Sequence, residues 1–303
     1  MLKRIDLKGE ALDLDYTFES GQIFQWSKAD GWWLGLVDHH ATLLRTEDGS
    51  LLFRAEDDLS EDALKRFLSL DIHYDELVRG RAIDEFSHSM LKRYRGVRIL
   101  RQDPWACLVA YMVSASLSIN AISKVLGSIS STAEELRVDG HSLPPFPGPG
   151  EFLHLRRPRS GYLGRKWDYL RSAAMRVTAG ELDFGDLRAL SYEGAWRSLV
   201  TAGQGHTLGV GPKVADCVLL FSLDKPEAFP IDRWILRGLK RHYDWMLPES
   251  MALKPKNREE AITRREYEGI SSNARSYFGD LGGLIQECLF LHMRTATPMR
   301  PWA

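Results

Sequence analysis

The chain has 303 residues, 44% of them hydrophobic and 27% charged, with a formal net charge of −1, which is the balance of an ordinary globular protein long enough for two or three packed subdomains. Its longest apolar runs, such as residues 106–113, are too short to span a bilayer, and no apolar segment follows the opening MLKRIDLKGE to make a secretory signal. The three cysteines (Cys107, Cys217 and Cys288) are far apart and odd in number, which favours a reducing, intracellular location over a disulfide scaffold, and no Cys and His cluster has the spacing of a zinc or iron–sulfur site.

Residues 22–55 predict an antiparallel meander of four short strands. The β-rich runs are QIFQWS, GWWLGLV, ATLLRT and SLLFR, and they are punctuated by KADG and EDGS, which are turn signals.

From about residue 60 the pattern becomes helical. Ser60 is a good N-cap for SEDALKRFLSL, and Asp103 with Pro104 is typical of the N-cap and first position of the helix DPWACLVAYMVSAS. Residues 143–150 (LPPFPGPG) have the composition of a linker. The other segments with helical spacing are AIDEFSHSMLKRY, a segment from Arg165 on, SYEGAWRSLVTA, KVADCVLLFSL, DRWILRGLKRHY and GGLIQECLFLHM.

These elements predict an α+β fold. We expect a small antiparallel-sheet N-terminal domain with helices over residues 1–100, followed by two mainly helical subdomains in residues 101–303. The second region is expected to contain a helix-hairpin-helix at about residues 192–223.

The near-neutral net charge hides a local excess of positive charge. Residues 1–60 hold twelve acidic residues against six basic ones, whereas residues 156–176 hold seven basic residues against one acid, Asp168. Such a stretch can bind a polyanion, although a solvated helix face explains it equally well.

The segment from Thr207 to Lys213 (TLGVGPK) lies between two amphipathic helices. Gly209 and Gly211 allow a tight turn with positive φ, and Pro212 suits the first position of the next helix. Backbone N–H groups of such a turn can bind a phosphate oxygen, although the same pattern also fits a plain helix–turn–helix connection.

Lys213 stands in the first turn of a helix that is otherwise almost wholly apolar over residues 214–223. Desolvation and the helix dipole both favour the neutral amine, which is the nucleophilic form, whereas a nearby carboxylate would act against them. Asp232, 19 residues later, begins another helix; it can be a simple N-cap or that carboxylate.

GVGPKVADCVLLFSLDKPEAFPID (residues 209–232) closely resembles the helix-hairpin-helix signature of the 8-oxoguanine DNA glycosylase/AP lyase family. The resemblance implies that Lys213 is the catalytic nucleophile and that Asp232 assists it. FESGQIFQW (residues 18–26) resembles the family element whose glycine carbonyl, here Gly21, accepts the N7–H that only the oxidised guanine has. DPWACLVAYMVSASLSINAI (residues 103–122) resembles the helix and loop that fill the hole left by the flipped base.

GGLIQECLF (residues 282–290) resembles the family's final helix, whose Gln and Phe hold the base. Gln286 and Phe290 are four residues apart and share one helix face, and Cys217 is four residues after Lys213. An amide and a ring are what a flipped-base pocket needs. Taken singly, Phe290 also fits a core position, Cys217 a small buried residue and Gln286 a surface amide.

The chain departs from the better-known eukaryotic members where they read the cytosine opposite the lesion. Their three consecutive asparagines align with Ser116, Leu117 and Ser118, and their arginines align with Ala121 and Lys166. A wedge tyrosine aligns with Arg165. Since lysine lacks the bidentate fork of arginine, we expect weak discrimination of the opposite base.

The resemblance therefore implies a bifunctional enzyme of base-excision repair without metal or organic cofactor. It excises 8-oxoguanine from double-stranded DNA through a lysine Schiff base and nicks the strand by β-elimination. The residues expected to contact the DNA are Gly209, Gly211, Ser116, Leu117, Ser118, Arg165 and Lys166. A DNA-associated monomer with no membrane partner is the default. The alternatives are a monofunctional alkyl-base glycosylase and a non-catalytic helix-hairpin-helix DNA-binding protein.

Overall fold

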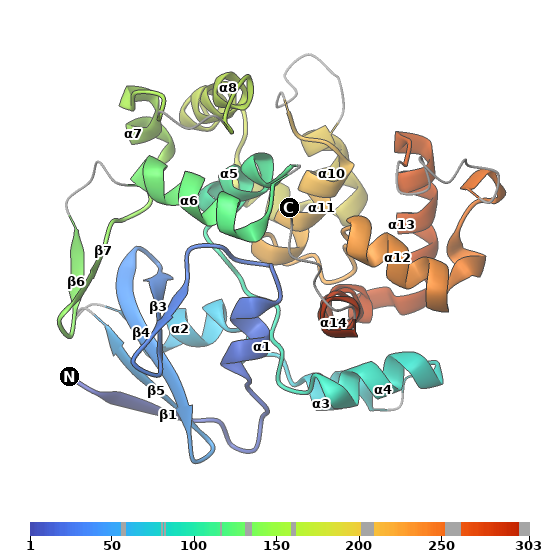
Figure 1. The fold of residues 1–303 in the computed structure, drawn as a ribbon, viewed down its shortest axis with the longest axis horizontal. Helices are drawn as coiled ribbons and strands as arrows, with labels where there is room; N and C mark the ends of the chain where they lie inside the picture. The colour runs from blue at the N-terminus through green and yellow to red at the C-terminus, as the bar shows by residue number, and fades with distance from the viewer. Residues whose placement is uncertain are drawn as a thin grey trace.

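The computed structural model describes residues 1–55, 59–79, 81, 83–115, 117–130, 135–158, 162–200, 209–251 and 262–296. Figure 1 shows the sheet at one side and the helices grouped above and beside it. The strands are β1 (Lys3–Asp6), β2 (Ser27–Ala29), β3 (Trp32–Val37), β4 (His40–Glu47), β5 (Ser50–Ala55), β6 (Leu136–Val138) and β7 (His141–Leu143). The helices are α1 (Leu14–Glu19), α2 (Glu61–Phe67), α3 (Tyr74–Val78), α4 (Glu85–Arg93), α5 (Pro104–Ser114), α6 (Ile119–Ser130), α7 (Pro149–His154), α8 (Lys166–Thr178), α9 (Phe184–Ala189), α10 (Tyr192–Val200), α11 (Pro212–Ser222), α12 (Arg233–His242), α13 (Arg264–Phe278) and α14 (Gly282–Ala296).

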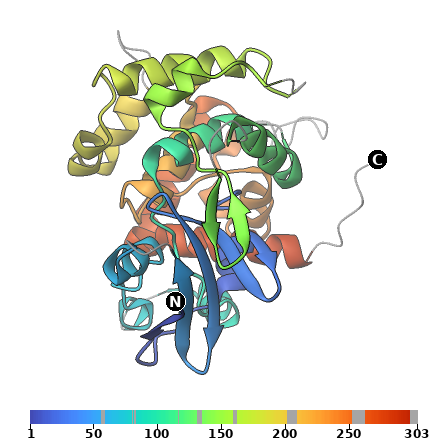
Figure 2. The same ribbon diagram turned by 90° about the vertical axis from the view of Figure 1, so that its left-hand side faces the viewer.

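The sheet is antiparallel, with the strand order β1-β5-β4-β3-β2. Side chains alternate between its faces, so Leu44 packs toward α1 and α2 while its neighbour Leu43 packs on the opposite face with Val138. The hairpin β6–β7 therefore covers the second face of the sheet, as Figures 1 and 2 show. Antiparallel strands followed by helical layers make this an α+β protein, as the sequence predicts.

The predicted strand at residues 22–27 is wrong, because residues 22–26 form an irregular segment and only Ser27 enters β2. The buried side chain of Gln22 explains the difference. Its amide donates to the Arg98 carbonyl and its Oε1 accepts the Leu100 N–H, so side-chain hydrogen bonds replace a strand ladder here. The sheet contains β1, which pairs with β5 and which the sequence pattern did not predict.

Most predicted helices are confirmed, and so are their caps. Ser60 and Asp103 each accept a backbone N–H in the first turn of α2 and α5, and Pro104 is the first residue of α5. The predicted linker at residues 143–150 is irregular only over residues 144–148, because Leu143 ends β7 and Pro149 begins α7. The segments that follow form α8, α10, α11, α12 and α14.

Two helical cores lie beside the sheet core. One joins α5, α6, α8, α10 and α11, and the other joins α12, α13 and α14 with α4, which comes from the N-terminal region. A domain boundary near residue 100 stays a prediction. Over the part of the chain described above, no helix is long and apolar enough to cross a membrane.

Candidate active site

Lys213 is the second residue of α11, which begins at Pro212, as the sequence predicts. Residues 214–222 of that helix are buried, and Lys213 is its one cationic side chain. The Lys213 Nζ lies 3.5 Å from the Ser114 hydroxyl at the end of α5 and 4.8 Å from the centroid of the Tyr111 ring. The end of α5 and the start of α11 thus meet at the proposed nucleophile.

Asp232 is the N-cap of α12 and accepts the Ile235 N–H at 2.8 Å. Burial raises the pKa of this carboxyl, while the Ile235 N–H and the positive charge of Lys213 oppose the rise. Asp232 is therefore the N-cap of α12, and its carboxyl is also within electrostatic reach of Lys213; its role in catalysis stays a prediction.

Gly21 and Phe290 lie against each other, and Gln286 stands one turn before Phe290 on α14. A side chain at Gly21 would place its Cβ only 3.0 Å from Cε1 of Phe290, so the backbone of the loop lies directly on the ring. Gln286 is 4% exposed, which excludes the surface-amide alternative, and its Oε1 has no hydrogen-bond partner among the described residues. A buried amide oxygen without a partner is suited to receive a ligand donor.

Cys217 is buried one turn after Lys213. Burial raises the pKa of its thiol to about 12, although the charge of Lys213 opposes the rise. The side chain is therefore a neutral thiol, fit for an apolar wall and not for nucleophilic attack.

Glu287 is a buried carboxyl that the sequence reasoning missed. It is 2% exposed, and its Oε2 has no partner within the described part of the chain. Burial raises the pKa of Glu287 to about 8, a hydrogen bond with Ser20 lowers it, and the charge of Asp232 raises it further. An acidic residue inside the apolar run LIQECLF is the signal that could have found it.

Asp216 was missed as well, and it is fully buried on α11 between Lys213 and Cys217. Its carboxylate accepts the hydroxyls of Tyr192 at 2.5 Å and Tyr267 at 2.6 Å. Burial raises the pKa of Asp216 to about 6 against the effect of these two hydrogen bonds. These hydrogen bonds link α11 to α10 and α13.

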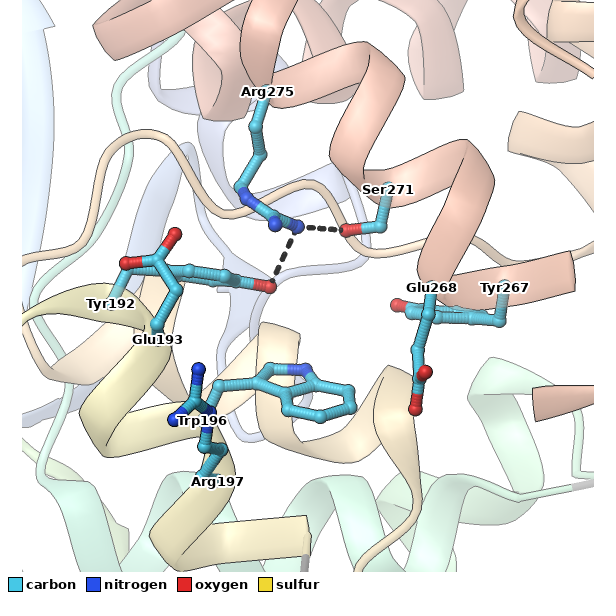
Figure 3. A pocket seen from close by; sticks show the side chains of 8 residues that line it. All are labelled: Tyr192, Glu193, Trp196, Arg197, Tyr267, Glu268, Ser271 and Arg275. Atoms are coloured by element: carbon cyan, nitrogen blue, oxygen red, sulfur yellow. Dashed lines mark hydrogen bonds between the residues drawn. The ribbon is translucent and has the colours of Figure 1, made fainter. Parts of the chain in front are cut away.

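Figure 3 shows the outer side of this network. Arg275 donates to the hydroxyls of Tyr192 and Ser271, and a cavity of about 170 Å³ opens between α10 and α13. None of the side chains proposed for catalysis or base binding lines this cavity, so it is separate from the site around Lys213.

The hairpin glycines behave differently from each other. Gly209 has φ +85°, and a Cβ there would lie 2.8 Å from Cδ2 of Tyr169, so only glycine fits. The expectation of positive φ is wrong for Gly211, whose φ is −89°; it is the extended N-cap of α11. Residues 201–208 of the hairpin lie outside the described residues.

The proposed hole-filling loop follows α5. Ser116 lies outside the described residues. Leu117 is partly buried and packs against the core that joins α5, α6, α8, α10 and α11. The Ser118 hydroxyl accepts the Ala121 N–H at the start of α6. Arg165 is exposed at the N-terminus of α8, whereas the next residue, Lys166, donates to backbone carbonyls at the end of α5.

The basic stretch of residues 156–176 is only partly available to a polyanion. Arg171 donates to the Leu153 carbonyl, and Arg176 lies 3.5 Å from Glu181. Arg156, Arg157 and Arg165 are exposed.

The comparisons with known proteins agree with this architecture. Residues 4–108 match the family described as 8-oxoguanine DNA glycosylase, N-terminal domain. The chain is 28% identical to the N-glycosylase/DNA lyase OGG1 of Arabidopsis thaliana over 295 residues, covering 92% of this chain and 77% of that protein.

It is also 26% identical to a probable N-glycosylase/DNA lyase of Methanothermobacter thermautotrophicus over 314 residues, covering 93% of each. Among solved structures, MBOgg1 in complex with a low affinity DNA ligand superposes with a TM-score of 0.80 at 28% identity, covering 97% of this chain and 96% of that one.

Proposed function

We propose that this chain is a member of the 8-oxoguanine DNA glycosylase/AP lyase family, and that it excises 8-oxoguanine from duplex DNA and nicks the strand. The enzyme class, a DNA N-glycosylase with lyase activity at apurinic or apyrimidinic (AP) sites, is that of its relatives. The observation that carries the proposal is Lys213 in the first turn of an apolar helix, within electrostatic reach of the N-capping Asp232.

The first step is recognition. The protein binds DNA phosphates without regard to sequence, and the lesion is turned out of the stack. In the proposed pocket the N7–H of 8-oxoguanine donates to the Gly21 carbonyl, the ring stacks on Phe290, and the Gln286 amide bonds the Watson–Crick edge. Cys217 forms the opposite wall.

Chemistry follows at C1′ of the sugar. The Lys213 amine forms a bond to C1′, the bond from C1′ to N9 of the base breaks, and the base leaves with a proton. The Asp232 carboxylate stabilises the positive charge that develops on the sugar. Loss of the sugar ring oxygen from C1′ gives the Schiff base; removal of a C2′ proton then breaks the bond from C3′ to its phosphate oxygen.

No step of this sequence uses a metal or an organic cofactor. We further propose a monomer that acts on DNA inside the cell, because every proposed role belongs to one chain and the substrate is genomic DNA.

The test is borohydride trapping on a duplex that contains 8-oxoguanine. The parent is expected to form a covalent adduct and to nick the strand, whereas Lys213→Gln forms neither and still binds the duplex. Lys28→Gln is the matched control, because Lys28 lies on strand β2 and pairs with Asp15 of α1. Undiminished trapping by Lys213→Gln would refute the assignment.

The same experiment separates the alternatives. On a second duplex that contains an alkylated base, a monofunctional alkyl-base glycosylase would release that base without an adduct. A DNA-binding module would bind the duplex and release nothing.

A further inference from the structure

Tyr111 is a buried aromatic residue of α5 whose hydroxyl reaches the loop that carries Gly21. Its side chain is 2% exposed, and its ring stacks on Phe221 with centroids 5.6 Å apart. The one hydroxyl proton is shared between two acceptors, the Gln22 carbonyl oxygen at 3.0 Å and the Gly21 carbonyl oxygen at 3.3 Å. Burial raises the pKa of Tyr111 well above its ordinary value, so the hydroxyl stays a donor.

The ring of the same residue lies under the nucleophile. The Lys213 Nζ is 4.8 Å from the ring centroid, within the range of a cation–π contact. Tyr111 is therefore in contact both with the group that attacks the sugar and with the backbone proposed to read the base.

The Gly21 carbonyl depends on this contact more than its neighbour does. The Gln22 carbonyl also accepts the Gln102 amide at 2.7 Å. Within the described residues, Tyr111 is the one donor that reaches the Gly21 oxygen. Gly21 has φ +85° and no side chain, so the peptide that follows it turns easily.

The direction of that peptide decides which base fits. A carbonyl oxygen directed into the pocket accepts the N7–H of 8-oxoguanine and is left facing an acceptor by normal guanine. If the peptide turned over, the N–H of Gln22 would point into the pocket instead, and it would suit the N7 acceptor of normal guanine. One carbonyl oxygen has two lone pairs, so it can keep the tyrosine donor while it accepts from the base.

We infer that Tyr111 is a positioning residue for lesion recognition: its hydroxyl holds the Gly21 carbonyl toward the pocket, and its ring supports Lys213. This inference rests on the proposed function. Nicking at an abasic site involves no base. Loss of the Tyr111 hydroxyl is therefore expected to affect base recognition alone, whereas loss of the ring is expected to affect the Lys213 reaction.

The experiment compares Tyr111→Phe with the parent in two assays. The first is the ratio of affinities for duplexes with 8-oxoguanine or guanine, each on a 2′-fluoro sugar that resists cleavage. The second is single-turnover nicking of an abasic duplex. Tyr111→Phe is expected to lower the affinity ratio by about 3- to 10-fold, the scale of one neutral hydrogen bond, and to leave abasic nicking unchanged.

Tyr94→Phe is the matched control. Its hydroxyl contacts Thr295 at 3.0 Å in a different core, so its loss is expected to change neither assay. Tyr111→Leu removes the ring as well, and we expect it to slow abasic nicking.

An unchanged affinity ratio in Tyr111→Phe would overturn the inference. So would abasic nicking that falls as much as the ratio, because that result would indicate general damage to the site. A parent that neither prefers 8-oxoguanine nor forms a borohydride adduct would overturn the proposed function itself.

Discussion

The Lys166 ammonium donates a hydrogen bond to the carbonyl oxygen of Ala115, 2.5 Å away, at the end of α5. A second bond at 2.8 Å reaches the Val113 carbonyl. Lys166 thus donates to carbonyls that a helix C-terminus leaves without partners. These carbonyls flank Ser114, whose hydroxyl contacts the Lys213 amine. The side chain that aligns with a cytosine-reading arginine is engaged inside the protein.

We therefore predict that the enzyme excises 8-oxoguanine opposite any of the four bases with weak preference. A lost bidentate reader removes about 1–3 kcal/mol of discrimination. The measurement is single-turnover excision from four duplexes that differ only in the opposite base. A preference for cytosine of about 100-fold or more would contradict the prediction, since two lost readers leave no source for it. Lys166→Ala is expected to lower the melting temperature and to leave the preference unchanged.

Asp232→Asn tests the carboxylate apart from the cap. Asparagine caps helices about as well as aspartate, so the melting temperature is expected to change little. Base release is expected to slow by about 10²-fold or more, the scale of a lost preorganised electrostatic group. Single-turnover excision and thermal unfolding are measured on the same preparation. A folded variant with a near-parental rate would leave Asp232 only its cap role.

Gly21→Ala tests the contact between the loop and Phe290. The added Cβ would stand 3.0 Å from the ring, and the φ of +85° is strained for alanine, so we expect a loss of both excision and stability. Gly31→Ala separates the two causes, because Gly31 has φ +78° and nothing within 4 Å of its added Cβ. That control should lose about 1–2 kcal/mol of stability and keep its excision rate. Equal excision by the two variants would mean that Gly21 is not at the pocket.

Phe290→Ala and Gln286→Ala test the base contacts on α14. Stacking on an aromatic ring is worth about 1–3 kcal/mol per base, so Phe290→Ala is expected to lower the 8-oxoguanine affinity by about 5- to 150-fold. Gln286→Ala is expected to reduce selectivity for 8-oxoguanine over guanine. Both are read from excision and binding on paired duplexes. If both variants behave as the parent does, α14 is structural and the pocket lies elsewhere.

Glu287 gives the protein a predictable pH dependence of stability. Its pKa rises from 4.5 to about 8 on folding, so the folded protein holds the proton more tightly than the unfolded chain. Stability from this group is present at low pH and is lost as pH rises through about 8. Glu287→Gln should remove that loss.

We expect the Gln variant to melt several degrees above the parent at about pH 8 and close to it at about pH 4. The charged groups that face Glu287 are Asp232, Arg294 and Lys213, and they are unchanged in the variant. A difference in melting temperature that does not vary with pH would show that folding leaves the pKa of Glu287 unchanged.

Local patterns in the sequence were enough for the class of fold and for the positions of Lys213 and Asp232 at two helix starts. Caps such as Ser60 and Asp103 act on residues within one turn, so their effect is visible in a short window of sequence. The segment from Gly209 to Asp232 is equally local, since both helix starts that carry Lys213 and Asp232 lie within it.

The tertiary structure alone decided which residues surround Lys213. Residues 22–26 have the composition of a strand, yet the buried Gln22 side chain takes its partners from residues near 100 and fixes an irregular loop. Tyr111 and Glu287 have ordinary neighbours in the sequence, and their roles arise only when α5, α11 and α14 pack against that loop. Hydrogen bonds and burial between distant segments leave no periodic trace, because each depends on a partner that sequence spacing does not specify.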